Sequence, residues 1–297
     1  MSDERTRDEN EGLISIGQLA EETGLAPDTI RVWERRYGKP VPVRLPSGHR
    51  RYRRPTVTWL RRVAEALSRG HRPHKVVRLG DAELNALLED AEATDTRMAD
   101  EALRLIRAGD RAALDRQLAS ERARRSPLAF VLEVATPLAH AVGRAWADGE
   151  LNVRHEHFFA EVLEHELRGL RRALPEGNGR VVLFTTLSGE RHGLGIQMAA
   201  VAAQIAGARP LVLGIDTPDE EIPLAAADHG ASFVALSVSL ATGGVEIDRR
   251  LARLREALPS DVALVVGGAG ARGVRRGPRG VTFISDLREF TALVADA

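Results

Sequence analysis

The chain has 297 residues, enough for two or three domains that each bury a core, and its 42 basic and 42 acidic residues cancel in formal charge. It has no cysteine, which excludes disulfides, zinc fingers, thiolate nucleophiles and cysteine-bound iron–sulfur clusters. Residues 1–12 are polar and charged, so we expect a disordered start and not a signal peptide. No run reaches the ~18 apolar residues of a membrane span. We therefore expect a cytoplasmic protein with no membrane partner.

The basic residues are concentrated near the N-terminus. From Arg31 to Lys75 there are 14 Lys or Arg residues and two acids, Glu34 and Glu65. A local block of this kind favours a polyanion as the partner of one domain. A solvated charged face is the alternative interpretation.

Two short helices are expected at the start of this block. Ser15 can cap a helix that Gly24 closes, and a second helix is predicted from Pro27 through Tyr37. Two short helices joined by a glycine-containing turn form a helix-turn-helix pattern. The second helix contains three arginines, Arg31, Arg35 and Arg36.

A turn and a basic, aromatic return strand follow from Arg44 to Tyr52, which indicates a wing against a phosphate backbone. The ordered segments Trp33–Gly38 and Gly48–Tyr52 resemble the winged-helix domain of MerR-family transcription regulators. The resemblance implies double-stranded operator DNA as partner of a domain over residues 13–79, in which we expect Trp33 to belong to the core. Pro73 and Gly80 indicate a linker from Arg72 to Gly80. The DNA contacts that the resemblance implies are Arg31, Arg35, Arg36, Tyr37, His49, Arg50 and Tyr52.

Residues 80–176 are rich in alanine and leucine with a helical period, which predicts a bundle of four or five helices. Trp146 lies at the end of one predicted helix, and Glu156 and His157 lie in the first turn of the next. Pairing of these two helices can bring the three side chains together. The predicted helices are Ala82–Ala91, Asp95–Ala108, Arg111–Arg122, Pro127–Ala147 and Val153–Leu174.

Residues 177–297 alternate apolar runs with helical segments, which predicts a parallel, doubly wound, flavodoxin-like sheet. The expected fold class is therefore multidomain α and α/β: a winged helix-turn-helix, a helical bundle and a doubly wound domain. Ligands of doubly wound folds bind beyond the C-terminal ends of the strands. The loop from Glu190 to Gly195 follows the first predicted strand, Val181–Thr186, and lies at such an end.

This loop places a carboxylate, Glu190, two residues before a histidine, His192, with glycines behind it. A lone loop histidine is more often structural than metal-binding, and no Ser or Cys nucleophile motif accompanies this one. The glycine-rich segment Val266–Gly270 lacks the full dinucleotide fingerprint, so a hydride-transfer enzyme is weakly supported. From the residues alone, the chemistry of the loop stays open.

The third part resembles the cobalamin-binding domains of methionine synthase, methylmalonyl-CoA mutase and B12-dependent regulators. Their Asp-x-His-x-x-Gly motif matches Glu190, His192 and Gly195, with Glu in place of Asp. The resemblance implies that His192 binds cobalt from below, that Glu190 holds its other ring nitrogen, and that the vitamin's tail lies between sheet and helices. Further matches are Ser237 of a Ser-x-Leu element, with Ser239 at the leucine position, and the Gly267–Gly268 pair.

The spacing Trp146, nine residues, Glu156–His157 resembles a motif of adenosylcobalamin-dependent light-sensing regulators of the CarH/LitR type. There these residues cap the upper face and contact the adenosyl group. The resemblance implies a non-enzymatic repressor that binds operator DNA in the dark as a holo homo-oligomer, expected to be a tetramer. Light cleaves the cobalt–carbon bond, and loss of the adenosyl group releases the DNA.

One position departs from that pattern. Some members have a histidine directly after the tryptophan that can bind cobalt after illumination, and here the residue is Ala147. A regulator that responds to B12 concentration or redox state, without a useful light response, is therefore the second hypothesis. A B12-dependent methyl carrier is a third, opposed by the DNA-binding head, and a protein-regulated repressor with a vestigial pocket is a fourth.

Overall fold

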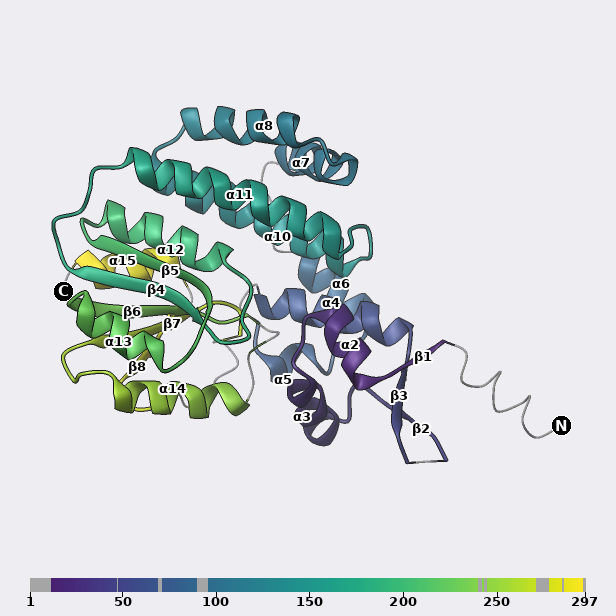
Figure 1. The fold of residues 1–297 in the computed structure, drawn as a ribbon. Helices are drawn as coiled ribbons and strands as arrows, with labels where there is room; N and C mark the ends of the chain where they lie inside the picture. Colours follow the sequence, from purple (N-terminus) through teal and green to yellow (C-terminus); the bar gives the residue numbers. More distant parts are fainter. Residues whose placement is uncertain are drawn as a thin grey trace.

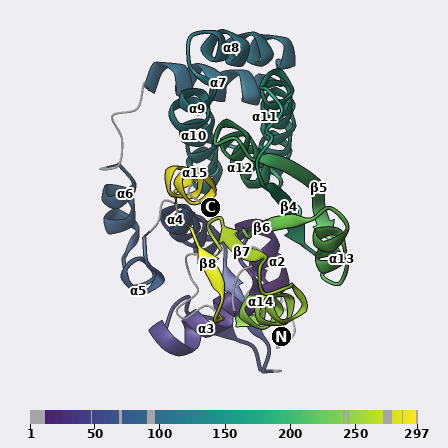
Figure 2. The ribbon, with the colours of Figure 1, turned by 90° about the vertical axis from the view of Figure 1, so that its left-hand side faces the viewer.

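The computed structural model describes residues 12–46, 48–68, 71–89, 96–239, 242, 245–270, 278–284 and 286–295. Three units follow one another along this part of the chain: a winged helix, a helical bundle and a parallel α/β unit (Figure 1). The bundle lies over the α/β unit on one side and reaches the winged helix on the other, as the perpendicular view in Figure 2 also shows. The disorder expected for the first residues lies outside the described part.

The helix-turn-helix forms where local signals predict it. Helix α2 (Ile16–Thr23) begins with a capping box, in which the Ser15 hydroxyl accepts from the Gln18 amide at 3.2 Å and Gln18 Oε1 accepts from the Ser15 amide at 2.9 Å. Gly24 ends it at φ 62°, a conformation that glycine adopts without strain. Helix α3 (Pro27–Tyr37) then buries Ile30 and Trp33, which confirms the core role of that tryptophan.

The wing is a hairpin of β2 (Val43–Arg44) and β3 (Arg50–Arg53). Strand β1 (Leu13–Ile14) pairs with the other edge of β3, which gives an antiparallel sheet in the order β1-β3-β2. Helix α4 (Pro55–Ser68) follows the wing directly and packs on α2.

The segment expected to be a linker belongs to the core of the first unit. Helix α5 (Pro73–Val76) lies within it, and α6 (Asp81–Glu89), which we expected in the bundle, packs on α4 instead. The first unit therefore extends beyond residue 79 to the end of α6, because these apolar side chains complete a small core that would otherwise be open to water. The side chains concerned are Val76, Val77, Leu84 and Leu88, which are all buried with Trp59 and Leu60.

The bundle consists of four antiparallel segments around one core. The long helix expected over residues 127–147 contains a π-helical turn, η1 (Val131–Ala135). Pro137 explains the wider turn, because it has no amide hydrogen to continue the helical ladder, while the Thr136 hydroxyl donates to the Val131 carbonyl at 2.9 Å. The regular helices of the bundle are α7 (Thr96–Ala108), α8 (Arg111–Ala123), α9 (Pro127–Phe130), α10 (Thr136–Ala147) and α11 (Val153–Ala173).

Within the described residues, only the segment Pro127–Ala147 is long and apolar enough to cross a membrane. Its side chains Phe130, Val134 and Leu138 are fully buried in the bundle core. Burial in the bundle accounts for its apolar composition.

The α/β unit has five parallel strands in the order β5-β4-β6-β7-β8, the flavodoxin-like order expected. All seven residues of β4 are buried, because helices α12 and α15 cover one face of the sheet and α13 and α14 the other (Figure 1). The strand order reverses between β4 and β6, so the loops after these two strands meet at the switch point. The elements are β4 (Val181–Leu187), α12 (Leu194–Ile205), β5 (Arg209–Thr217), α13 (Glu221–Asp228), β6 (Ala231–Ser237), α14 (Val245–Ala257), β7 (Ala263–Gly267), β8 (Val281–Phe283) and α15 (Leu287–Ala295).

Candidate functional site

The loops after β4 and β6 are joined by one buried carboxylate. Glu190 is 1% exposed, and its Oε1 accepts from His192 Nδ1 at 2.6 Å and from the His192 amide at 2.9 Å. Its Oε2 accepts from the Ser239 amide at 2.7 Å and from the Thr242 hydroxyl. Burial alone would raise the pKa of Glu190, but these hydrogen bonds from His192, Ser239 and Thr242 lower it to about 2. The site therefore holds an ionised carboxylate at neutral pH.

His192 is held in one orientation by this carboxylate. Because an ionised carboxylate only accepts hydrogen bonds, Nδ1 carries the proton and Nε2 is left as the nitrogen that can bind a metal. The Glu190 hydrogen bond raises the pKa of His192, against the opposing effect of desolvation. In the described part of the chain, no group of three or more His, Asp or Glu side chains could hold a bare metal ion. A single exposed imidazole suits a metal whose other ligands come from its own macrocycle.

Ser239 and Thr242 belong to this candidate site although the sequence does not indicate it. The sequence shows Ser239 only as a departure from a leucine, yet its backbone amide donates to Glu190, and hydrogen bonding by Ser239 helps to lower the pKa of that carboxyl. Thr242 lies 52 residues from Glu190, and nothing near it in the sequence indicates the contact. The strand order alone brings these two loops together.

Above this histidine lies a cavity of about 430 Å³, here named the upper cavity. Trp146 from the end of α10, Glu156 and His157 from the first turn of α11, and His192 all line it. The structure therefore brings together these four residues singled out from the sequence. Glu156 Oε2 and His157 Nε2 lie 3.7 Å apart, and the His157 side chain is largely exposed. Side chains of α2 and α4 complete the wall, a contribution that the sequence did not indicate.

Ala147 does not border the upper cavity and is 1% exposed. Successive helical residues are rotated by about 100°, so a Trp146 side chain facing the cavity turns its neighbour away from it. In this arrangement the alanine serves packing.

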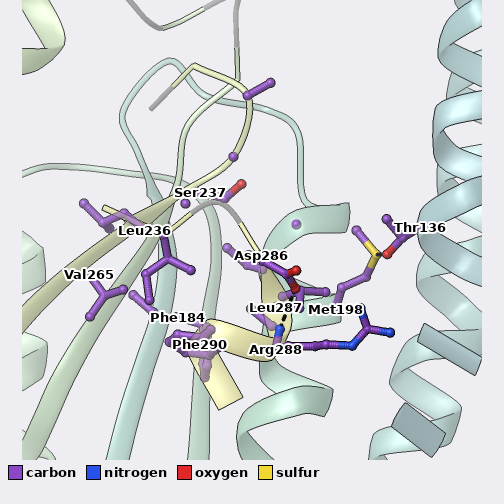
Figure 3. Close-up of a pocket in the computed structure, with 18 of the residues that line it drawn as sticks. Thr136, Phe184, Met198, Leu236, Ser237, Val265, Asp286, Leu287, Arg288 and Phe290 are labelled. Carbon is purple, nitrogen blue, oxygen red and sulfur yellow. Dashed lines mark hydrogen bonds between the residues drawn. The ribbon is translucent and has the colours of Figure 1, made fainter. Parts of the chain in front are cut away.

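A second cavity of about 450 Å³, here named the side cavity, lies between the sheet and helices α12 and α15 (Figure 3). Gly195, Ser237, Gly267 and Gly268 line it, as expected for the vitamin's tail. Deeper inside, Phe184 and Phe290 meet edge to face with ring centroids 5.9 Å apart. Both cavities border Ala269, so they adjoin. Together they suit a ligand with a broad body above His192 and an apolar tail beside the sheet.

Two of these glycines are required by close approach. A Cβ on Gly195 would lie 2.5 Å from Ser237 Oγ, and one on Gly268, where φ is 94°, would lie 2.4 Å from the Val238 carbonyl oxygen. Neither position has room for a side chain. Gly195 lets its backbone approach the Ser237 side chain, and Gly268 lets its backbone approach the Val238 backbone, both beside the cavity.

The basic surface of the winged helix contains most of the residues expected to contact DNA. Arg31, Arg35 and Arg36 are exposed on α3, and His49 and Arg50 are exposed on the wing. Arg31 pairs with Asp28 at 2.6 Å. Tyr37 is partly buried, and the Arg36 guanidinium lies 5.5 Å from its ring centroid.

The expectation that Tyr52 contacts DNA is wrong, because its side chain is fully buried. Alternate residues of a strand face opposite sides, and Tyr52 is on the inner side of β3. Its hydroxyl donates to Glu34 of α3, and Glu34 also pairs with Arg50 at 3.3 Å. Tyr52 and Glu34 therefore join the wing to the recognition helix.

Comparison with known families and structures agrees with this architecture. Residues 14–82 match the MerR HTH family regulatory protein model, and residues 98–170 and 180–281 match two B12 binding domain models. The monomethylamine corrinoid protein of Methanosarcina barkeri aligns over 68% of this chain and 99% of its own, with TM-score 0.51 and 17% identity. At that identity the likeness shows the fold alone.

Two curated relatives from Myxococcus xanthus extend over most of the chain. HTH-type transcriptional repressor CarA is 28% identical over 87% of this chain and 88% of its own length. HTH-type transcriptional repressor CarH is 31% identical over 88% of this chain and 91% of its own length. With this identity and coverage, and with all three domain models matched in order, the chain belongs to the family of CarH-type MerR transcriptional regulators with B12-binding domains.

Proposed function

We propose that this regulator is a cytoplasmic transcriptional repressor that uses adenosylcobalamin as a light-sensing ligand. The observation that supports it most is the shared upper cavity: a carboxylate-held imidazole on one side, and Trp146, Glu156 and His157 on the other. This arrangement offers an imidazole nitrogen to a metal on one side and an aromatic and charged enclosure on the other, which suits binding of a bulky metal-containing ligand. The DNA contacts that we propose are Arg31, Arg35, Arg36, Tyr37, His49 and Arg50.

His192 Nε2 would bind cobalt from below, and Glu190 would keep the proton on Nδ1. Gly195, Ser237, Gly267 and Gly268 would border the tail in the side cavity. Trp146, Glu156 and His157 would surround the upper ligand. When bound, the cofactor supplies a cobalt–carbon bond that light can cleave.

Removal of the adenosyl group would change what the upper cavity encloses and so bias the packing of the bundle on the α/β unit. We propose that the dark holo form is a homo-oligomer, most simply a tetramer, whose paired heads bind two operator half-sites. Such binding depends on phosphate contacts and should weaken steeply with salt.

The test is a gel-shift on the DNA flanking the gene, with size-exclusion chromatography, run with and without adenosylcobalamin in the dark and after green light. We expect a red protein that retards DNA and elutes as an oligomer only when it is dark and loaded. A protein that stays colourless after incubation with cobalamin would contradict the proposal.

Ala147 favours a second candidate, a regulator that responds to cobalamin level or redox state. Its methyl group is buried and offers no imidazole to cobalt after photolysis. This candidate predicts that hydroxocobalamin and adenosylcobalamin have the same effect on DNA binding, whether or not the sample is illuminated.

A further inference from the structure

The winged-helix unit makes direct contact with the end of α10, where Trp146 lies. Helix α4 runs against α10 so closely that a Cβ on Gly143 would lie 2.6 Å from Glu65 Oε2. At the helix end, Arg62 Nε donates to Asp148 Oδ1 at 3.1 Å. The DNA-binding unit and the bundle are therefore packed together where α4 meets α10 (Figure 1). Residues of both helices line the upper cavity.

Arg61 of α4 is the central residue of this contact. Its guanidinium carbon lies 4.5 Å from the centroid of the Trp146 ring, within the range of a cation–π interaction. The same group donates to the Trp146 carbonyl at 3.3 Å and to the Glu22 carbonyl at 2.7 Å. The indole edge also reaches the α2–α3 turn, because a Cβ on Gly24 would lie 3.8 Å from Trp146 Cη2. Trp146 is thus held between the bundle and the winged helix.

This contact lies at the cavity that an upper ligand would enter. Arg61, Trp146 and His192 line one cavity, and a group bound above His192 must enter it. A bulky ligand that packs on the indole face covered by the guanidinium would compete with Arg61 for that surface.

We infer that the winged-helix unit forms the third wall of the upper cavity, and that Arg61 clamps Trp146 in a closed position that the cofactor's adenosyl group must displace. The inference rests on the proposed function for the identity of the ligand. By linkage, a ligand that displaces Arg61 loosens the head from the bundle, and a docked head weakens binding of that ligand by the same factor. The clamp gives the cofactor site a direct physical connection to the DNA-binding unit.

The clamp predicts a difference between two cobalamins. Hydroxocobalamin has a small upper ligand and can bind His192 without moving Arg61. Adenosylcobalamin has a bulky one and cannot. Releasing the clamp should therefore strengthen binding of adenosylcobalamin only.

The first measurement is hydrogen exchange on full-length, cofactor-free protein. Arg61→Gln removes the charge and the stack, and should raise exchange over residues 16–24 and 136–147 by about 3- to 10-fold, the range expected for a cation–π contact. Arg54→Gln is the matched control, because Arg54 also contacts Glu22 but does not line the cavity. Unchanged exchange in Arg61→Gln, with an unchanged melting temperature, would overturn the clamp.

The second measurement is the affinity of each variant for the two cobalamins in the dark. Arg61→Gln should bind adenosylcobalamin about 3- to 10-fold more tightly, with hydroxocobalamin and the Arg54→Gln control unchanged. Arg61→Lys keeps the charge but loses the planar stack, so its affinity for adenosylcobalamin should lie between those of wild type and Arg61→Gln. A fall in adenosylcobalamin affinity would mean that Arg61 contacts the ligand, and an equal change for both cobalamins would mean a general effect; either overturns the competition. If wild type binds neither cobalamin, the proposed function fails, whatever the exchange shows.

Discussion

Glu190 and His192 on the lower side of the upper cavity are fixed by hydrogen bonds within one unit, whereas Trp146 on the upper side is surrounded by residues from different units. Each donor to Glu190 comes from a loop at the end of a buried strand. The contacts of Trp146 instead cross from α10 to α4 and to the α2–α3 turn. The lower side is suited to hold a ligand in one geometry, and the upper side is suited to change when the ligand changes.

Removing the imidazole should have the largest effect. His192→Ala should weaken both adenosylcobalamin and hydroxocobalamin by about 100-fold or more, because the lost cobalt bond lies below the corrin in both. Absorption spectroscopy and equilibrium dialysis measure it, with His229→Ala on the exposed end of α13 as control. An unchanged bound spectrum would refute the role of His192.

Replacing the buried carboxylate should have the second-largest effect on cobalamin affinity. Glu190→Gln keeps the shape but presents an amide to donors that need an acceptor, so cobalamin affinity should fall by about 10- to 100-fold for both forms. The free energy of unfolding of the cofactor-free protein in urea checks independently whether Glu190 is held by these donors.

The pH dependence of that unfolding follows from the pKa of Glu190, which is about 2 in the folded chain against an ordinary value of 4.5. A lowered pKa stabilises the fold above pH 4.5, and the contribution is lost as pH falls toward 2. Wild type should therefore lose stability more steeply than Glu190→Gln over this range. If stability falls with pH equally in wild type and in Glu190→Gln, the carboxylate of Glu190 is not held by hydrogen bonds that lower its pKa.

An upper-side change should discriminate between cobalamins, as no lower-side change does. Glu156→Ala removes a charged side chain that lines the upper cavity and should weaken adenosylcobalamin by about 10-fold while leaving hydroxocobalamin unaffected. Titration of both cobalamins in the dark measures the ratio. Equal losses would erase the functional distinction between the two sides.

The smallest effect on cobalamin affinity is expected from the loss of one of the several hydrogen-bond donors to Glu190. Thr242→Val removes one donor to Glu190 and leaves the Ser239 amide and both His192 contacts in place. Cobalamin affinity should fall by about threefold, and equally for both forms. A loss as large as that of Glu190→Gln would show that the hydrogen-bond network acts as a unit and has no redundancy.

Much of the local structure follows from the sequence. The Ser15 cap, the Pro27 start and the Gly24 stop set the helix-turn-helix, because each acts on a backbone within a few residues. The strand, loop and helix around His192 follow in the same way from an apolar run, a glycine-rich loop and a small-residue helix. Side-chain roles that depend on distant partners were less predictable. The sequence pattern predicts that Tyr52 contacts DNA from the wing, but its side chain is buried and its hydroxyl donates to Glu34.

What the sequence by itself determined is therefore the order of the units, most of the helices and strands, and four of the residues that line the upper cavity. The tertiary structure decided that α6 completes the first core, that Ser239 and Thr242 hold Glu190, and that Arg61 lies on Trp146. The physical reason is separation along the chain. Caps, turns and periodicity act over a few residues, whereas these contacts join positions that only the strand order and the docking of α4 on α10 bring together.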